Sequence, residues 1–180
     1  MTSTAIDSSI VTAEYELDHR LMFRAYLALA KWRLVVAVLV MSLLIGSLIY
    51  FFVLIGEQQI LWQTSPLFIG VPLMGVAGQL LRLHAASRKY VSSLLPSQRV
   101  IRYVFRAEAD SYEVYFGESY SLVAWSDQLK ALERSGYFML FHNRYDFGVI
   151  PKSAFEPNGL PVFRQIIRSK MGDRAHVEPN

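Results

Sequence analysis

The longest uninterrupted apolar pattern in the chain is "LVVAVLVMSLLIGSLIYFFVLI", residues 34–55, which contains no charged side chain. A helix needs about 20 apolar residues, each adding about 1.5 Å, to cross the hydrocarbon core of a bilayer. The pattern therefore predicts a transmembrane helix. Glu14, Glu16 and Asp18 precede it where a cleaved signal peptide carries a short basic segment, so we expect the chain to keep its N-terminus.

A second apolar segment begins at residue 60 or 65 and ends at residue 83. It contains glycines and prolines, which are more frequent in membrane helices than in soluble ones: Pro66, Gly70, Pro72, Gly75 and Gly78. Because only a short turn, residues 56–64, separates the two segments, the pattern predicts an antiparallel transmembrane hairpin.

Small residues within the hairpin, including Ser42 and Gly46, have two interpretations. They could form a face on which two copies of the chain associate. We favour the other interpretation, in which they let the two helices of one chain pack closely.

Charges flanking the hairpin predict its orientation. Basic residues precede the first span (Arg20, Arg24, Lys31, Arg33) and follow the second (Arg82, Arg88, Lys89), whereas the turn has Glu57 and no Lys or Arg. Positive charge collects on the cytoplasmic side, so both termini are expected in the cytoplasm. Arg82, Arg88 and Lys89 are also candidate contacts for anionic lipid headgroups, each contributing about 1 kcal/mol near such a surface.

Beyond residue 89 the pattern changes to alternation of apolar and polar residues. Short alternating runs separated by turn residues begin near residues 101, 112, 120, 129, 137 and 147, which is typical of an antiparallel sheet. An amphipathic helix follows over residues 160–171, with Gly172 as its stop.

The segment "IVTAEYEL" near the N-terminus alternates in the same way, with Val11, Ala13, Tyr15 and Leu17 on one face. Such a strand has no core of its own. Because both termini are expected in the cytoplasm, we predict that it covers an edge of the sheet beginning near Val100.

These patterns give a predicted domain organisation. Residues 1–9 are a disordered terminus, 10–33 a strand and interfacial helix, and 34–55 the first span. Residues 56–64 are an extracytoplasmic turn, 65–83 the second span, and 84–98 a helical extension and linker. Residues 99–172 form the β domain with its final helix, and 173–180 are a disordered tail.

Composition agrees with a chain that lies partly in lipid and partly in water. Hydrophobic residues make up 53% of the 180 residues, and the mean hydropathy is +0.26. The chain has no cysteine and four scattered histidines without H-x-x-x-H spacing, so we expect no metal and no cofactor.

The tripeptide Asp146-Phe147-Gly148 matches the magnesium-binding motif of protein kinases, but the rest of a kinase is absent from the sequence. There is no G-x-G-x-x-G loop, and "DHR" at residues 18–20 has the wrong order for a catalytic loop. We interpret residues 143–146 as a polar turn between two strands, in which Asp146 serves the turn. His84 and His142 are expected to be structural, and Lys152 to be solvated.

No carboxylate pair, activated nucleophile or phosphate loop stands out. We therefore predict no catalytic residue and no enzymatic activity. "RSGYFMLF", residues 134–141, loosely matches the aromatic strand of an RNA-binding module. Its alternating Tyr137, Met139 and Phe141 favour core packing instead, and no nucleic acid partner is expected.

The stretch "VAWSDQLKALERSGYFMLFHNRYDFGVIPKSAF", residues 123–155, resembles the C-terminal domain of the YcxB-like family of bacterial membrane proteins. Trp125 at a strand end and the closing Ile-Pro-Lys-x-x-Phe, with Pro151, Lys152 and Phe155, carry the resemblance, and these residues are expected to be structural. The plan of the whole chain is also similar. The resemblance implies a β domain like bacterial pleckstrin-homology modules and no particular activity.

The sequence thus predicts an α+β membrane protein of a bacterial inner or plasma membrane, with a two-helix transmembrane hairpin and a cytoplasmic, pleckstrin-homology-like antiparallel β domain ending in a helix. We expect a membrane-tethered interaction or regulatory module that contacts membrane lipids and an unidentified protein partner, with a homo-oligomer left open. The alternatives are an accessory subunit of a transporter and a membrane-anchored enzyme.

Overall fold

The computed structural model describes residues 10–56, 58–144 and 146–178, without the side chains of residues 58–69. The chain forms two compact units. Residues Met1–Met22 and Tyr90–Asn180 make one, here called the β unit, and Phe23–Lys89 make the other, the helical unit. The fold is mixed α and β, as predicted.

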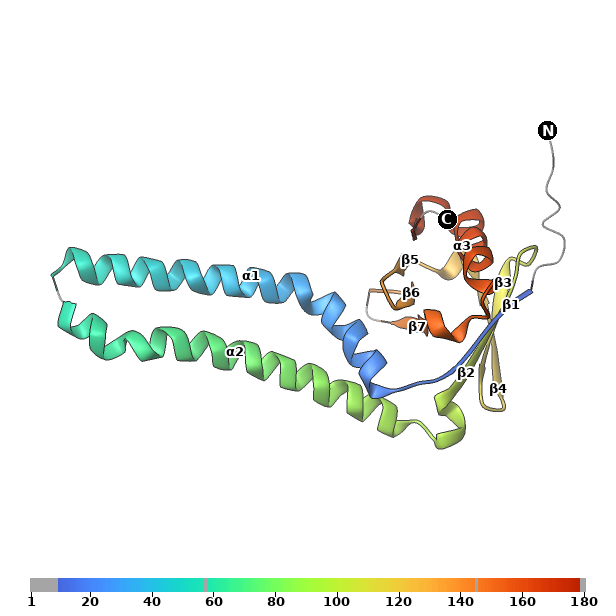
Figure 1. Ribbon diagram of the computed structural model, residues 1–180, viewed down its shortest axis with the longest axis horizontal. Coiled ribbons are helices and arrows are strands. Elements are labelled where there is room, and N and C mark those ends of the chain that lie inside the picture. Colours follow the sequence, from blue (N-terminus) through green and yellow to red (C-terminus); the bar gives the residue numbers. More distant parts are fainter. Residues whose placement is uncertain (1–9, 57, 145, 179–180) are drawn as a thin grey trace. The chain divides into compact units, whose positions relative to one another are not determined.

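Two long helices, α1 (His19–Leu54) and α2 (Gln58–Ser93), account for the helical unit (Figure 1). They run antiparallel and meet near one end, where the Phe23 ring lies edge-on to the His84 ring at 5.6 Å between centroids. In the described part of the chain, α1 is the one helix long and apolar enough to cross a membrane. An 18-residue apolar stretch within this helix has a mean hydropathy of 2.7, and none of its residues is buried.

The second helix begins close to the earlier of its two predicted starts, residue 60. α2 begins at Gln58 and stays helical through Pro66 and Pro72, so the connection between the helices is shorter than residues 56–64. Proline has a φ that suits a helix, although it removes one hydrogen bond. Gly56, with φ +77°, lies in the connection.

Close helix packing at the glycines, the interpretation we favoured, is wrong for the described atoms. A Cβ added at Gly46, Gly70, Gly75 or Gly78 would have no described atom within 4 Å. The small side chains therefore do not bring the two described helical segments together. Self-association of two copies through this face stays an open alternative.

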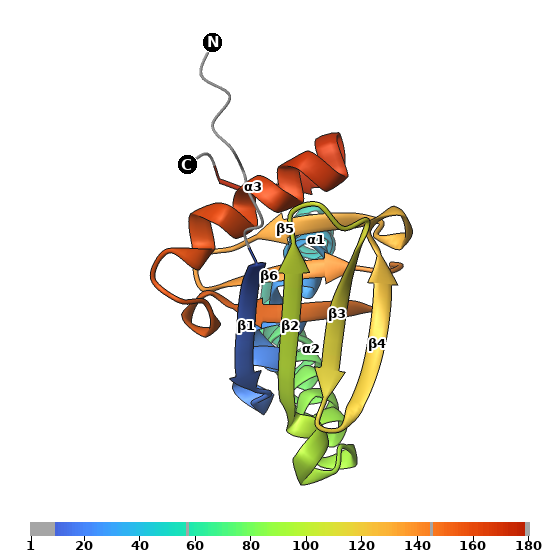
Figure 2. The same cartoon turned by 90° about the vertical axis from the view of Figure 1, so that its right-hand side faces the viewer.

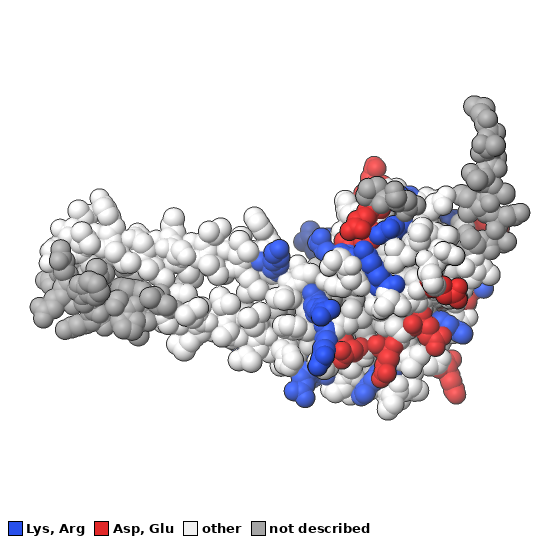
Figure 3. Space-filling model, in the orientation of Figure 1, with Lys and Arg blue, Asp and Glu red and all other residues white. Residues whose placement is uncertain are grey.

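The helical unit also has a one-sided distribution of charge. Its charged residues, as far as the structure describes them, are all basic: Arg24, Lys31, Arg33, Arg82, Arg88 and Lys89. They gather at the end where Phe23 and Lys89 connect to the rest of the chain, and the remaining described length is white in Figure 3.

The β unit contains two four-stranded sheets rather than the single meander expected. The first has the order β1-β2-β3-β4 and is antiparallel throughout, with strands Ile10–Glu16, Val100–Arg106, Ser111–Phe116 and Ser119–Ala124. The second has the order β7-β6-β5-β8, with strands Phe147–Pro151, Tyr137–Phe141, Lys130–Glu133 and Ala175–His176. β8 pairs parallel to β5, and the other pairs are antiparallel.

Short 3₁₀ helices connect these elements: η1 (Pro96–Arg99), η2 (Trp125–Asp127), η3 (Lys152–Ala154) and η4 (Gly172–Arg174). Helix α3 spans Gly159–Met171 and ends at Gly172, whose φ is +53°. The predicted final helix and its glycine stop are confirmed.

The N-terminal strand occupies the edge predicted for it. β1 pairs with β2 over its whole length, with Val11 opposite Phe105 and Ala13 opposite Tyr103. The Leu17 amide continues the pairing by donating to the Arg99 carbonyl at 2.8 Å. Val11, Ala13 and Leu17 are buried, as their alternation predicted.

The expected disordered tail is wrong for residues 173–178, which contain η4 and β8. The Glu178 amide donates a 2.8 Å hydrogen bond to the Glu133 carboxylate. This hydrogen bond holds the C-terminal segment against the buried carboxylate. The pattern of apolar and polar residues in the sequence does not predict such a contact, which is why the segment was expected to be disordered. Residues 1–9 and 179–180 lie outside the described chain.

The strands of the second sheet cross those of the first, and α3 lies over one end of the resulting sandwich (Figure 2). Its Phe163 side chain has no exposed surface and contacts rings from both sheets, with centroids 4.4 Å from Phe105 and 5.0 Å from Phe138. Tyr137 to Phe141 are all buried, which confirms core packing for the aromatic strand.

Candidate functional site: a pocket between the two sheets

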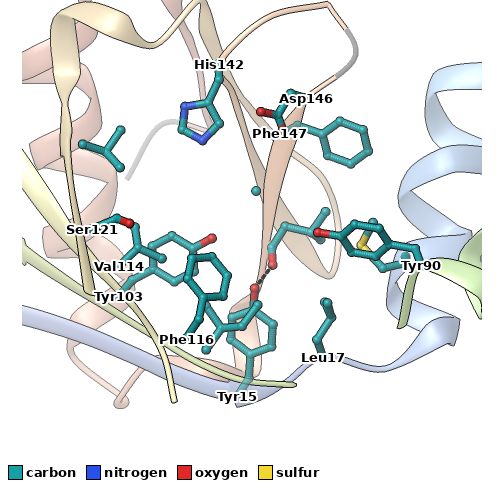
Figure 4. Close-up of a pocket in the computed structure, with 15 residues that line it drawn as sticks. Tyr15, Leu17, Tyr90, Tyr103, Val114, Phe116, Ser121, His142, Asp146 and Phe147 are labelled. Atoms are coloured by element: carbon teal, nitrogen blue, oxygen red, sulfur yellow. Dashed lines mark hydrogen bonds between the residues drawn. The ribbon is translucent and has the colours of Figure 1, made fainter. Parts of the chain in front are cut away.

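A pocket of about 260 Å³ lies within the β unit, between the inner faces of the two sheets (Figure 4). Strands β1 to β4 line one side and β7 the other, and no residue of α3 contributes. A sandwich of crossing sheets has open corners that side chains must fill. Helix α3 fills one of them, and the pocket marks a part of the interior that the described side chains leave open.

Tyrosines line the floor of the pocket. The Tyr15 hydroxyl donates to the Val149 carbonyl, which joins β1 to β7. The rings of Tyr15 and Tyr103 lie nearly parallel, with centroids 6.4 Å apart. Tyr103 also contacts the Phe105 ring, at 5.8 Å, so its position is fixed by packing.

Gly148 is required by this packing, which accounts for the glycine of the kinase-like tripeptide. A Cβ at this position would lie 2.7 Å from the Tyr103 hydroxyl, closer than van der Waals contact allows. Phe147 and Gly148 of the tripeptide therefore begin β7, and the glycine is required by a tyrosine from the opposite sheet.

The phenols that line the pocket are held in their neutral form. Burial raises the pKa of both Tyr15 and Tyr103 above its ordinary value. Burial, and to a lesser extent the negative charge of Asp146, also raises the pKa of Tyr90. These hydroxyls therefore act as hydrogen-bonding groups at physiological pH rather than as anions.

His142 and Asp146 line the pocket together, and Figure 4 shows the His142 ring directed into it. The Gln128 side-chain nitrogen lies 2.6 Å from His142 Nδ1. The Gln128 amide and the His142 ring are therefore hydrogen-bonded to each other, which orients the ring.

The predicted polar turn is confirmed in its backbone. The amides of His142 and Asn143 donate to the Asp146 carbonyl at 3.0 and 3.3 Å, and the Asp146 amide donates to Asn143 Oδ1 at 2.9 Å. Asn143 supplies the side chain that holds the turn, so the Asp146 carboxylate is left to line the pocket. His142, which was expected to be structural, and Asp146, which was assigned to the turn, therefore both line the pocket.

Lys152 does not line this pocket and is not the solvated lysine that we expected. Its Nζ lies 2.6 Å from an oxygen of Glu133, whose side chain is only 1% exposed. Arg164 donates to the same carboxylate through two nitrogens, at 2.5 and 3.1 Å. The cluster joins β5, η3, α3 and the C-terminal segment, and its role is structural.

The positively charged neighbours of Glu133 strongly lower the pKa of its carboxyl group. Burial alone would raise the pKa of Glu133, but hydrogen bonds from Arg164, Lys152 and the Glu178 amide outweigh it and lower the pKa to about 2. Glu133 is therefore ionised at any physiological pH, and it is a fixed anion rather than a proton donor.

The other residues that carried the family resemblance are also placed in the framework of the β unit. Trp125 is buried against Tyr112, with ring centroids 4.8 Å apart. Pro151 ends β7, and Phe155 is buried against Phe163 at 4.7 Å and bridges to Ala13 of β1. None of the three lines the pocket.

Arg82, Arg88 and Lys89, the candidate lipid contacts, all lie on α2 with exposed side chains. Arg82 and Lys89 are two helical turns apart and share a face, whereas Arg88 points about a third of a turn away. Lipid contact through these residues stays a prediction.

Sequence patterns missed the three tyrosines of the pocket. Alternation placed Tyr15 and Tyr103 on inner faces of strands, a position that core residues share, and Tyr90 lies beyond the second span with no pattern of its own. Their convergence depends on how the two sheets and the end of α2 that carries Tyr90 pack together, which is a property of the folded unit.

Among the described residues, no group of three His, Asp or Glu side chains could hold a metal ion. Comparison with known proteins found no matching family model, curated protein or solved structure.

Proposed function

We propose that this chain is an integral membrane protein in which α1 and α2 form a transmembrane hairpin and hold a pleckstrin-homology-like binding module at the cytoplasmic face. The observation that carries the proposal is α1 itself, a 36-residue helix whose apolar stretch of 18 residues has no buried residue. A helix that is hydrophobic all round requires either a protein core or lipid around it.

Helix α1 exposes large apolar side chains along its length. Leu39, Leu43 and Leu54 on α1 are 62%, 75% and 65% exposed. Exposed apolar surface costs roughly 25 cal/mol per Å² in water, and patches of this extent mark membrane or protein contact. A bilayer removes that cost along the whole helix.

The described part of α2 supports a second span. Val71, Leu73 and Met74 are exposed apolar residues, and no charge lies between them and Arg82. The basic residues at the ends of both helices support an orientation with both termini in the cytoplasm. The resemblance to the YcxB-like family is consistent with the same arrangement.

A binding role for the β unit follows from its pocket. The lining combines apolar walls with a few polar groups, which is the usual composition of a ligand site. In the described part of the lining, the Ser121 hydroxyl makes no hydrogen bond to His142 or Asp146, so we favour a binding or regulatory module over a membrane-anchored enzyme or a transporter subunit.

Membrane extraction tests the proposal. The chain should stay in the membrane pellet after alkaline carbonate washing. Leu43→Arg places a charge at the centre of the first span, where insertion costs roughly 2.5 to 3.5 kcal/mol more, and should shift the chain toward the soluble or degraded fraction.

Leu129→Arg is the matched control, because Leu129 is an exposed leucine of the β unit, 48% exposed. It should leave the distribution unchanged. Release of the unaltered chain by carbonate, or equal behaviour of the two variants, would refute the proposal.

A further inference from the structure

We infer that the pocket of the β unit binds a small organic ammonium ion, either as a free molecule or as the headgroup of a lipid. The inference rests on the proposed function of the β unit as a binding module and names the chemistry of its ligand.

Five tyrosine and phenylalanine side chains are among the fifteen residues that line the pocket: Tyr15, Tyr90, Tyr103, Phe116 and Phe147. The faces of such rings carry partial negative charge and attract a cation that lies within about 6 Å of the ring centre. Groups of rings of this kind are the usual binding site for quaternary and methylated ammonium groups.

The charged residues of the lining favour a cationic ligand. The lining contains one carboxylate, Asp146, and no Lys or Arg. An anionic ligand would meet Asp146 with no Lys or Arg in the lining to compensate it, whereas an ammonium group would be attracted by the carboxylate and by the rings together.

The arrangement of the polar groups leaves room for such a ligand between them. Tyr90 and Ser121 enter the view from opposite sides, with His142 and Asp146 above the floor formed by Tyr15 and Tyr103 (Figure 4). The Tyr15 hydroxyl is already engaged by the Val149 carbonyl, so Tyr15 offers its ring to a ligand. The His142 ring can form a hydrogen bond with a hydroxyl next to the ammonium group, as in an amino alcohol.

The volume sets an upper limit on size. About 260 Å³ is slightly below the range of roughly 300 to 1,000 Å³ found for drug-sized ligands. A trimethylammonium or ethanolamine group fits such a space, and a nucleotide or a folded peptide does not.

Titration of the full-length chain tests the inference. The protein is placed in nanodiscs of phosphatidylglycerol, a lipid without an ammonium group, and titrated with choline by calorimetry at constant ionic strength. The neutral isostere 3,3-dimethylbutan-1-ol, which has the shape of choline without its charge, is the control ligand. We expect saturable binding of choline that is at least tenfold tighter than binding of the isostere.

Variants locate the site. Asp146→Asn should weaken choline binding at least tenfold, whereas Asp173→Asn, which changes an exposed carboxylate outside the pocket, should not. Ser121→Lys introduces a positive charge beside the pocket and should abolish binding. Ser119→Lys adds the same charge to the same strand outside the lining and should leave binding intact.

The source of the ammonium group is distinguished by repeating the titration in phosphatidylcholine nanodiscs. A tenfold loss of apparent choline affinity there identifies the lipid headgroup as the occupant, and unchanged affinity identifies a free ammonium compound. Choline that binds no better than its isostere, or equally to folded Asp146→Asn and Ser121→Lys proteins, overturns the inference. That outcome leaves the membrane proposal standing, because carbonate extraction tests it separately.

Discussion

Gly148 shows how a single residue connects the sequence to the fold. The tripeptide around it suggests phosphoryl transfer, yet the glycine is explained by the approach of the Tyr103 hydroxyl from the opposite sheet. Tyr103 is buried between neighbouring rings and cannot move aside without disturbing them.

Gly148→Ala is therefore expected to lower the free energy of unfolding by about 1 to 3 kcal/mol, the usual cost of overpacking a core. Gly136→Ala is the matched control, because a Cβ there meets no described atom within 4 Å. Thermal or chemical unfolding measures both. Adding Tyr103→Phe to Gly148→Ala should restore part of the loss, and a full-sized loss in the double variant would contradict the steric explanation.

The lowered pKa of Glu133 predicts that the stability of the β unit depends on pH. Its pKa falls from the ordinary 4.5 to about 2 on folding, so its contribution to stability is complete above pH 4.5 and is lost as the pH falls toward 2. The difference corresponds to roughly 3 kcal/mol of unfolding free energy.

Unfolding free energies measured from pH 6 down to pH 2 would reveal this loss. Glu133→Gln should be less stable at pH 6 and should flatten the curve in this window. Glu118→Gln, which alters an exposed glutamate in the β3–β4 turn, should retain the wild-type curve. A wild-type curve for Glu133→Gln would rule out this role for the cluster.

At the scale of elements, β1 joins the N-terminal segment of the chain to the sheets of the β unit. Its pairing with β2 ends where the Leu17 amide meets the Arg99 carbonyl, so a short loop can join these strands directly. Residues 96–178 alone expose the edge of β2 and should aggregate. The same segment preceded by residues 10–17 and a short glycine-rich loop should fold.

Two variants sharpen this prediction. Ala13→Glu places a charge on the buried face of β1, where Ala13 has no exposed surface, and should prevent the rescue. Thr12→Glu changes the opposite, exposed face and should permit it. Sedimentation and hydrogen exchange would separate the outcomes, and rapid exchange of the amides of residues 11–17 in the full chain would refute the pairing.

Sequence patterns predicted most elements because their periodicities are local. The strands alternate, α1 is continuously apolar, and α3 carries an apolar stripe that ends at a glycine. The division into two sheets, the parallel strand β8 and the pocket depend instead on contacts between distant residues. β8 has two residues, Ala175–His176, which are too few for any periodicity.

Candidate chemistry was harder to predict than the fold for the same reason. Lys152 follows a proline in a loop-like stretch, and only the packing of β5 against α3 reveals its partner Glu133. Asp146 was assigned to a turn, and the turn exists. That Asn143 holds the turn and leaves the carboxylate to the pocket is decided by side-chain geometry.

For the whole molecule, the central claim is that the two helices cross the membrane and return the chain to the cytoplasm. The natural absence of cysteine makes this directly measurable, because a single introduced thiol is the only one present. Ile55 lies in the connection between α1 and α2 and is 52% exposed, and Glu118 lies in an exposed turn of the β unit.

Cells producing Ile55→Cys or Glu118→Cys are treated with a membrane-impermeant maleimide while the cytoplasmic membrane is intact, and again after it is permeabilised. The account predicts that Cys at position 55 is labelled in both conditions and that Cys at position 118 is labelled only after permeabilisation. Labelling of position 118 in intact cells, or protection of position 55 until the membrane is opened, would contradict it.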